Sequence, residues 1–457
     1  MECASNEIAA NFAAGPPHLR KVLTLKDLIV YGIVAVTPSA PVTVFGLASV
    51  MSRGHALDTI LLAMCAMVLT AVSYGRMSAL YPSAGSAYTY VGRGLNPYLG
   101  FLAGWAMLLD YLVIPLFCVI YGTLAGQRLI PQIPYALWAA FFAGAITFLN
   151  LVGIRSTTRA NMALLTFMGA VLVGFIVMAI RFLILHQGWG GLFSFKPFYD
   201  SANFDFHSLT AATSFAALTY LGFDAVTTLA EDAKNPRRDV LLSTVLVCVF
   251  TGVFGGLLVY LAQLAWPDFH TYKNVETAFM DVTQLVGGNW LFQAMAILLV
   301  LANVGAGLTA QVGAARLLFG MGRDGVLPGR VFAYLHPKRN TPTINLWIIG
   351  LVAYVGSLLM NYELTAEILN FGAFLGFMGV NFATFWQFYI VGQPQRKRHF
   401  VMDALLPGLG FLFCLGIWWG LATPAKIAGG VWFAAGLIYL VLKTRGFRVF
   451  PQMIRFE

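Results

Sequence analysis

Charged side chains are scarce in this sequence. Asp, Glu, Lys and Arg together make up 10% of the 457 residues, whereas a soluble domain carries about 25%. Cysteine is also sparse, because the chain has five and no pair has the spacing of metal ligands. The low charge excludes a soluble enzyme and a disordered chain, and the few cysteines exclude a disulfide-stapled secreted domain.

Motifs of common catalytic and nucleotide sites are missing as well. The chain has no GxxxxGK[ST], HExxH or GxSxG pattern, and none of its seven histidines form an i, i+4 pair. The match GMGRDG at 320–325 follows an apolar run rather than a strand, so the dinucleotide interpretation fails. We therefore predict no catalytic residue, no metal and no cofactor.

Long apolar runs dominate what is present. Hydrophobic residues make up 59% of the chain, and its mean hydropathy is +0.76. A spanning helix needs about 20 mostly apolar residues. We predict an all-α polytopic membrane protein with twelve transmembrane helices, at 25–50, 57–79, 97–127, 134–153, 161–184, 208–232, 238–265, 289–320, 342–360, 365–391, 402–421 and 425–443. The polar start of the chain lacks the features of a cleaved signal peptide, so the first span is expected to direct insertion.

The basic residues predict the orientation. With both termini on one side, that side carries 22 Lys and Arg and the other carries 6. Basic residues accumulate in cytoplasmic loops, so both termini are expected in the cytoplasm of a bacterial inner-membrane protein. The net charge of +9 then reflects topology and not a nucleic-acid partner, and no obligatory protein partner is evident.

Two of the predicted spans look interrupted near their centres. The first carries Pro38 and Pro41, and the sixth carries Gly222 and Asp224. Proline and glycine are common in membrane helices, and one such site alone would mean little. A matched pair, each opening a block of five spans, favours an inverted repeat with a substrate site at the bilayer midplane.

Three stretches of sequence carry a family resemblance. They are SYGRMSALYPSAGSAYTYVGRGLNPYLGFLAGW at 73–105, LGFDAVTTLAEDAKNPRRD at 221–239 and ARLLFGMGRDGVLP at 315–328. Each resembles the amino acid–polyamine–organocation (APC) transporters, and LLDYLVIP at 108–115 is similar to the bacterial putrescine importers among them. The resemblance covers nearly the whole chain.

The resemblance implies the leucine-transporter fold, a 5+5 inverted repeat with two additional helices. We expect a cytoplasmic tail at 1–24, a ten-helix core at 25–391 and a tail at 446–457, with a basic loop and helices 11 and 12 at 392–445. Within the core, repeat one is 25–185 and repeat two is 207–391. It also implies import by alternating access, coupled to a proton or, alternatively, to sodium.

The break in the first span suggests the substrate class. Relatives that carry amino acids hold the α-carboxylate on backbone N–H groups of a Gly-rich break, but here Pro38 and Pro41 supply no donor. Free carbonyls remain, and they suit an ammonium group. The expected contacts are Val36, Thr37, Ser39 and Ala40.

Asp110 lies near the centre of the third span. An Asp there costs about 2.5–3.5 kcal/mol on insertion scales, which makes it a functional candidate. Tyr111 could offer its ring to a cation, and Pro115 frees the Tyr111 carbonyl. The alternative is a buried Asp that hydrogen-bonds a neighbouring helix.

Other candidates follow the sixth break. Asp224 either caps the second half of that span or faces the substrate, and Tyr220 and Phe223 either line the pocket or pack ordinarily. Glu231 is a proton site, an interfacial residue that ends the helix, or part of an inner gate. The gate partners would be Arg76, Arg316 or Arg323.

We therefore predict a secondary transporter that imports putrescine or a related polyamine. An amino-acid permease of the same superfamily is the alternative.

Overall fold

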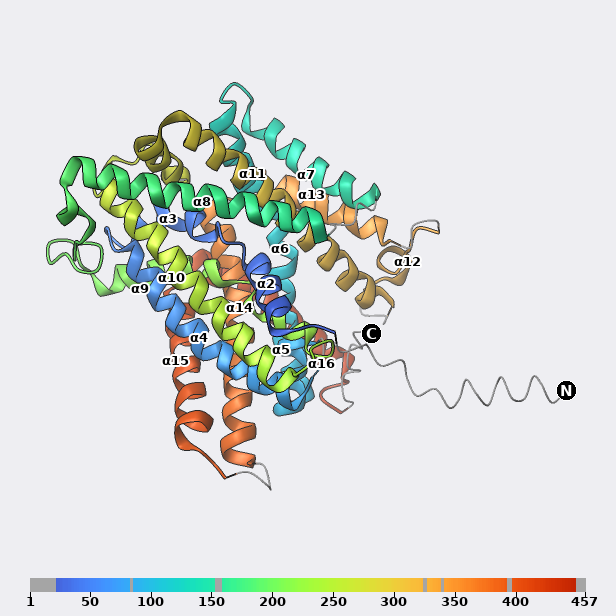
Figure 1. Cartoon of the computed structure of the whole chain (residues 1–457). Helices are drawn as coiled ribbons and strands as arrows, with labels where there is room; N and C mark the ends of the chain where they lie inside the picture. Colours follow the sequence, from blue (N-terminus) through green and yellow to red (C-terminus); the bar gives the residue numbers. More distant parts are fainter. Residues whose placement is uncertain are drawn as a thin grey trace.

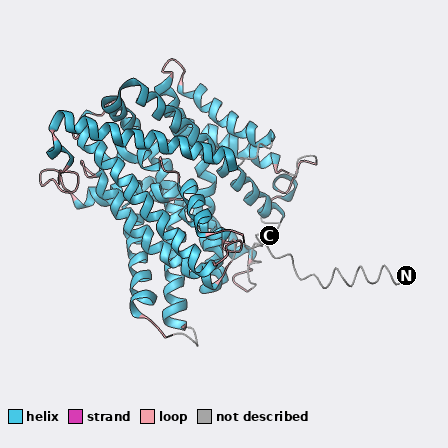
Figure 2. Cartoon of the chain, in the orientation of Figure 1, coloured by secondary structure: helices cyan, strands magenta, loops and turns pink. Residues whose placement is uncertain are grey.

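The computed structural model describes residues 22–82, 85–152, 158–323, 327–337, 341–392 and 397–448. In these ranges every regular element is helical, and no strand occurs (Figure 2). The first half of the chain contains α2 (Leu25–Val36), α3 (Ala40–Met51), α4 (Ala56–Leu80), α5 (Ser86–Gly94), α6 (Pro97–Leu129), α7 (Tyr135–Val152), α8 (Thr158–Gln187) and η1 (Trp189–Leu192). The second contains α9 (Phe206–Ala216), η2 (Ala217–Tyr220), η3 (Phe223–Leu229), η4 (Pro236–Val240), α10 (Leu241–Ala265), η5 (Phe269–Thr271), η6 (Val275–Thr277), α11 (Ala278–Arg323), α12 (Gly329–Phe332), α13 (Thr343–Leu359), α14 (Tyr362–Phe385), η7 (Trp386–Val391), η8 (Val401–Leu405), α15 (Leu406–Gly420) and α16 (Thr423–Lys443).

The number of membrane spans is close to the prediction. Within the described residues, ten helices are long and apolar enough to cross a bilayer, and the bent pair α2 and α3 brings the count to eleven. The segment predicted as the ninth span is α13, a shorter apolar helix of 17 residues. The exact number of twelve therefore stays a prediction.

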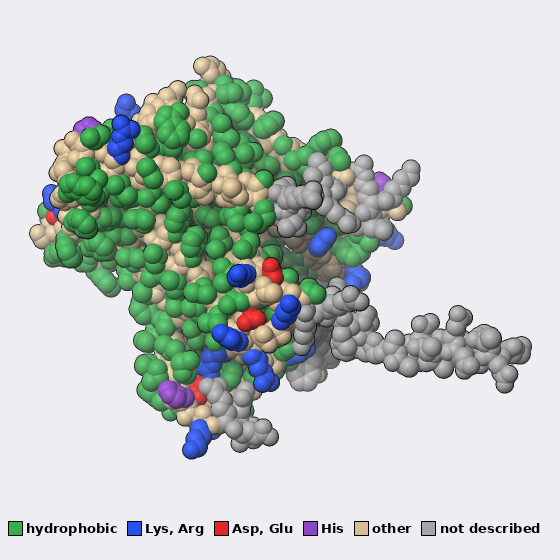
Figure 3. Space-filling view, in the orientation of Figure 1, with side chains coloured by type: hydrophobic (Ala, Val, Ile, Leu, Met, Phe, Trp, Pro, Cys, Tyr) green, Lys and Arg blue, Asp and Glu red, His purple; other side chains and the backbone are tan. Residues whose placement is uncertain are grey.

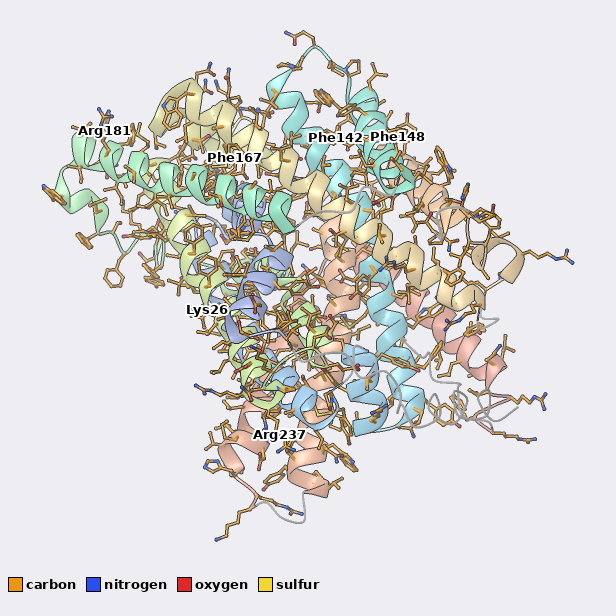
Figure 4. All side chains as sticks on the ribbon, turned by 45° about the vertical axis from the view of Figure 1, so that its right-hand side comes forward. Lys26, Phe142, Phe148, Phe167, Arg181 and Arg237 are labelled. Atoms are coloured by element: carbon orange, nitrogen blue, oxygen red, sulfur yellow. The ribbon has the colours of Figure 1, made fainter. Side chains whose placement is uncertain are left out.

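Apolar side chains cover much of the outer surface of the helix bundle. Trp347 and Leu351 on α13 are each 63% exposed, and Val431 on α16 is 67% exposed. On the face in Figure 3, hydrophobic residues form the upper body, and most Lys and Arg gather at its lower end. Arg181 and Arg237 lie toward opposite ends of the bundle (Figure 4). An apolar belt with charge at its ends is the surface that a bilayer requires.

Polar bridges and small residues join the helices inside the bundle. The Asn150 side-chain amide on α7 donates to the Gln311 Oε1 on α11 at 2.8 Å, and the Gln311 amide donates to the Thr147 hydroxyl at 2.8 Å. A Cβ at Gly350 of α13 would lie 2.2 Å from the same Thr147 hydroxyl. Close approach at glycine and interhelical hydrogen bonds are the usual means of helix association in lipid.

The first span is broken between α2 and α3. Thr24 caps α2 in a capping box with Asp27, and the helix ends at Val36. Thr37 then takes a positive φ of 64°, and α3 starts after Ser39 with its axis bent by 45°. Pro38 has no N–H to donate to the Val34 carbonyl, so the helical hydrogen bonds stop at this point.

The sixth span is interrupted at Gly222. Asp205 caps α9, which passes into the 3₁₀ turn η2 and ends there at Tyr220. Gly222 has a φ of 100°, in the left-handed region that favours glycine. The 3₁₀ helix η3 follows it, so this span changes direction and helix type at one residue.

The segments α2 and η3 are joined at their ends away from the breaks. Leu23 forms a parallel bridge with Ala233, and the backbone N–H groups of Val22 and Leu23 both donate to the Asp232 carbonyl at 3.0 Å. Leu28 of α2 packs with Val226 of η3 and with Ala230, the residue after η3, in a hydrophobic cluster separate from the main core. We call these joined segments the α2–η3 unit.

The helix α11 is bent near its start. Gly288 has a φ of 73°, which divides a short leading helix from the long membrane span (Figure 1). The turns η5 and η6 and this leading part of α11 all contact α3. We call residues 268–287, which contain them, the helical hairpin. A Cβ at Gly46 of α3 would lie 1.8 Å from the Val275 carbonyl oxygen of η6, so backbone packs on backbone here.

Candidate functional site

The two breaks meet each other in the structure. A Cβ at Gly222 would lie 2.9 Å from the Ala35 carbonyl oxygen, so the sixth span touches the end of α2 through backbone alone. Val36 is the last residue of α2 and is 5% exposed, and Ser39 is 1% exposed at the start of α3. Thr37 and Ala40 are half-buried beside them. The structure therefore brings the predicted contacts of the first break next to the sixth.

Asp110 is buried on α6. It is 8% exposed, and its Oδ1 atom has no hydrogen-bond partner among the described residues. Pro115 lies inside the same helix, so the Tyr111 carbonyl lacks its usual helical donor. A buried carboxylate oxygen without a partner is expensive in an apolar medium and marks a position that a ligand can satisfy. Among the described residues, the alternative of a hydrogen bond from that atom to a neighbouring helix is not observed.

Asp224 lies at the start of η3 and is 7% exposed. The N-cap position of η3 is occupied by Gly222, so Asp224 is inside the first turn rather than at the cap itself. Its charge is close enough to act on both Asp110 and Tyr111 of α6. Two carboxylates from different repeats therefore lie near each other, and in the described part of the chain neither forms an ion pair with Lys or Arg.

Aromatic rings surround this acidic pair. Tyr31 of α2 and Tyr74 of α4 both lie within electrostatic range of Asp224. The Phe223 ring packs edge-on to Tyr74, with centroids 5.5 Å apart. Tyr31 is 41% exposed, whereas Tyr74 and Phe223 are fully buried. No local feature of the sequence indicates Tyr31 or Tyr74, because their approach to Asp224 depends on the packing of distant helices.

Tyr220 contacts α4 through its hydroxyl. This hydroxyl donates to the Ile60 carbonyl on α4 at 2.8 Å, and the side chain is fully buried. The bond joins η2 to α4 just before the break at Gly222. It fits the packing alternative, and the pocket-lining alternative stays a prediction.

A layer of aromatic rings from α6, α9 and α14 lies beside α3. Tyr362 of α14 stacks near Phe117 and Tyr121 of α6, with ring centroids 5.2 Å apart in both pairs. The Tyr362 hydroxyl donates to the Thr43 carbonyl of α3 at 2.9 Å, and Phe215 meets the Tyr362 ring edge-on. We call Phe117, Tyr121, Phe215 and Tyr362 the aromatic layer.

The predicted gate residues come from three separate segments of the chain. Arg76 is buried in an ion pair with Asp403 of η8, and its guanidinium lies 4.0 Å from the centroid of the Phe388 ring. Glu231 is exposed just after η3, and in the described residues no ion pair of it is found. Arg316 and Arg323 are exposed on α11. The structure thus joins Arg76 to a residue that sequence reasoning missed.

Glu367 is a further buried acid that the sequence analysis did not single out. It lies on α14, is 1% exposed and accepts a hydrogen bond from the Ala422 N–H at 3.3 Å. Its place inside the predicted span 365–391 is a signal that could have identified it, because an acid inside a span is rare.

Comparison with known proteins identifies the family. The model of the family described as amino acid permease matches residues 31–447. This protein belongs to the amino acid permease family. The resemblance to APC transporters is thereby confirmed, and with it a leucine-transporter-like fold and a membrane permease rather than an enzyme.

Individual relatives of this permease differ in their substrates. The low-affinity putrescine importer PlaP of Escherichia coli (strain K12) is 31% identical over 94% of this chain and 95% of its own length. The branched-chain amino acid permease BcaP of Bacillus subtilis (strain 168) is 27% identical over 94% of this chain and 95% of its own. The methylthioribose transporter of the same strain is 30% identical over 93% and 94%.

Proposed function

We propose that this permease imports putrescine or a related polyamine across the bacterial cytoplasmic membrane by alternating access. The observation that carries the proposal is the buried Asp110 carboxylate, whose Oδ1 atom lacks a partner while Asp224 lies within electrostatic range. Similarity to the putrescine importer PlaP supports the same substrate.

The chemistry of the site favours a dication without a carboxylate. Two buried acids repel each other and lose solvation, and a ligand with two ammonium groups relieves both effects. The rings of Tyr31 and Tyr111 can contact ammonium groups through their faces. At the first break, Pro38 and Pro41 lack the N–H donors that would hold a carboxylate.

Direction and driving force follow from charge. With the termini in the cytoplasm, as the Lys and Arg count predicts, the aromatic layer lies on the outer side of Asp110. An inward-negative potential of 100 mV then favours entry by about 2.3 kcal/mol per positive charge. We propose proton coupling, with sodium as the alternative, and leave Glu231 and the arginines Arg76, Arg316 and Arg323 as candidates for coupling or gating.

The test replaces Asp110. Asp110→Asn should lower putrescine uptake at least about tenfold, because a tenfold loss corresponds to only about 1.4 kcal/mol of binding. Asp58→Asn on α4 is the matched control, since Asp58 is another acid within a span and lies outside the acidic pair. Both variants are quantified in the membrane first. Equal uptake by Asp110→Asn and wild type would contradict the assignment.

An amino-acid permease is the second candidate, favoured by the similarity to BcaP. Purified protein in liposomes separates the two functions when labelled putrescine, spermidine, ornithine and neutral amino acids are compared. Imposed pH and sodium gradients, varied separately, identify the coupling ion. If neutral amino acids inhibit putrescine uptake at the same concentrations at which unlabelled putrescine does, the second candidate is favoured.

A further inference from the structure

A cavity lies between the helical hairpin and the end of α6, and neither Asp110 nor Asp224 lines it. Its volume is about 480 Å³, within the range of small-molecule sites. The α6 side contributes Leu124, Gln127, Arg128 and Pro131, and the other side contributes Asn274, Glu276, Thr277 and Phe292. Polar groups therefore converge on it from η6 and α6.

Of the charged side chains that line this cavity, Glu276 is the acid that can bind a cation. Arg128 forms an ion pair with Asp281 of α11, and its guanidinium lies 5.4 Å from the centroid of the Phe292 ring. Its positive charge is thus compensated and its position fixed. Glu276 is exposed, and among the described residues it has no ion pair. The Oδ2 atom of Asp281 is likewise buried without a hydrogen-bond partner there.

The cavity adjoins the aromatic layer. Leu124, which lines the cavity, lies about one helical turn after Tyr121 on α6. The Tyr121 hydroxyl is fully buried and has no hydrogen-bond partner in the described residues. The cavity therefore lies beside a member of the aromatic layer whose hydroxyl is unsatisfied.

We propose that this cavity is an outer binding site for the ammonium group of an amine, with Glu276 as its charged acceptor. The proposal rests on the proposed import of an amine and on the orientation that the basic residues predict. A carboxylate in a cavity with low-dielectric walls concentrates cations locally and raises their rate of entry. A neutral or anionic substrate would gain nothing from it.

The test measures KM and kcat for labelled putrescine entering from the outside, in right-side-out vesicles at low and high salt. Glu276→Gln should raise the external KM about threefold to tenfold at low salt and leave kcat unchanged. Glu276→Lys should raise it further. The difference from wild type should shrink at high salt, because the Debye length falls from about 30 Å at 0.01 M to about 10 Å at 0.1 M.

Asp268→Asn is the matched control. Asp268 is an exposed acid on the same hairpin that caps η5 and does not line the cavity, and asparagine can keep that cap. It removes the same charge and should raise the external KM much less than Glu276→Gln does. Inside-out vesicles supply the second control, because Glu276→Gln should not alter the KM for entry from the cytoplasmic face.

The outcomes separate this site from the proposed function. Wild-type protein that moves no amine in either direction contradicts the proposed function itself. Normal wild-type transport with an unchanged external KM in Glu276→Gln overturns the outer site alone. An equal rise in Asp268→Asn, or an equal rise on both faces, also overturns it, because the effect would not then belong to this cavity.

Discussion

The ion pair between Arg76 and Asp403 offers the sharpest test of the packing. Only 8% of the Arg76 side chain and 2% of the Asp403 side chain are exposed. Arg76 also donates to the Met402 carbonyl, and Asp403 accepts a hydrogen bond from the His399 N–H at 2.7 Å. The pair thus joins α4 to the start of α15 at a point where neither charge reaches water freely.

Replacing one member of this pair should be severe. Asp403→Asn removes the negative charge that faces the buried Arg76 guanidinium, and breaking a buried pair in this way costs about 3–5 kcal/mol. Replacing both members with apolar residues of similar volume, as in Arg76→Met with Asp403→Leu, removes both desolvated charges. The double variant should therefore regain most of the loss, since such replacements are often neutral or stabilising.

Thermal unfolding of the purified protein in detergent measures these effects, with Glu231→Gln as the comparison. The structure predicts a clear drop in melting temperature for Asp403→Asn and almost none for Glu231→Gln, because Glu231 is exposed. A normal melting temperature for Asp403→Asn together with a lowered one for Glu231→Gln would refute the packing and favour the Arg76–Glu231 gate.

Two further predictions concern Gly222 at the sixth break and the Asp205 cap of α9. Gly222→Ala should destabilise the protein by about 1–3 kcal/mol and reduce transport, because alanine disfavours a φ of 100°. Gly416→Ala is the control, because a Cβ there meets nothing within 4 Å, and its melting temperature should equal that of wild type. Equal melting temperatures for the two variants would contradict backbone strain at position 222. The Ser208 hydroxyl and N–H lower the pKa of Asp205, so its stabilisation should be complete above an ordinary pKa of about 3.9 and fade as pH falls through the native value. Melting of Asp205→Asn against wild type across pH checks this, and a constant gap would contradict it.

Local features of the sequence were sufficient for the spans and the breaks. Pro38 stops the helical hydrogen bonds wherever it occurs, and Gly222 permits a φ that other residues resist. Asp110 was identifiable because a charge at the centre of an apolar run is costly regardless of its neighbours. These inferences needed only the chain around each residue.

Contacts between distant helices could not be predicted from the sequence in the same way. Asp403 is 327 residues from Arg76, and nothing near either residue indicates the other. The same holds for Tyr31 and Tyr74 beside Asp224, and for the Tyr220 hydroxyl on the Ile60 carbonyl. Such pairings depend on how the helices pack in three dimensions, and sequence periodicity does not encode that packing.

The α2–η3 unit has a mechanical consequence. Its two segments join the break positions Thr37 and Gly222 at one end and are tied together at Leu23 and Ala233 at the other. Moving one segment without the other would break the backbone hydrogen bonds from Val22 and Leu23 to the Asp232 carbonyl. Tyr31 and Asp224, which lie one on each segment, are therefore expected to move together when the unit moves.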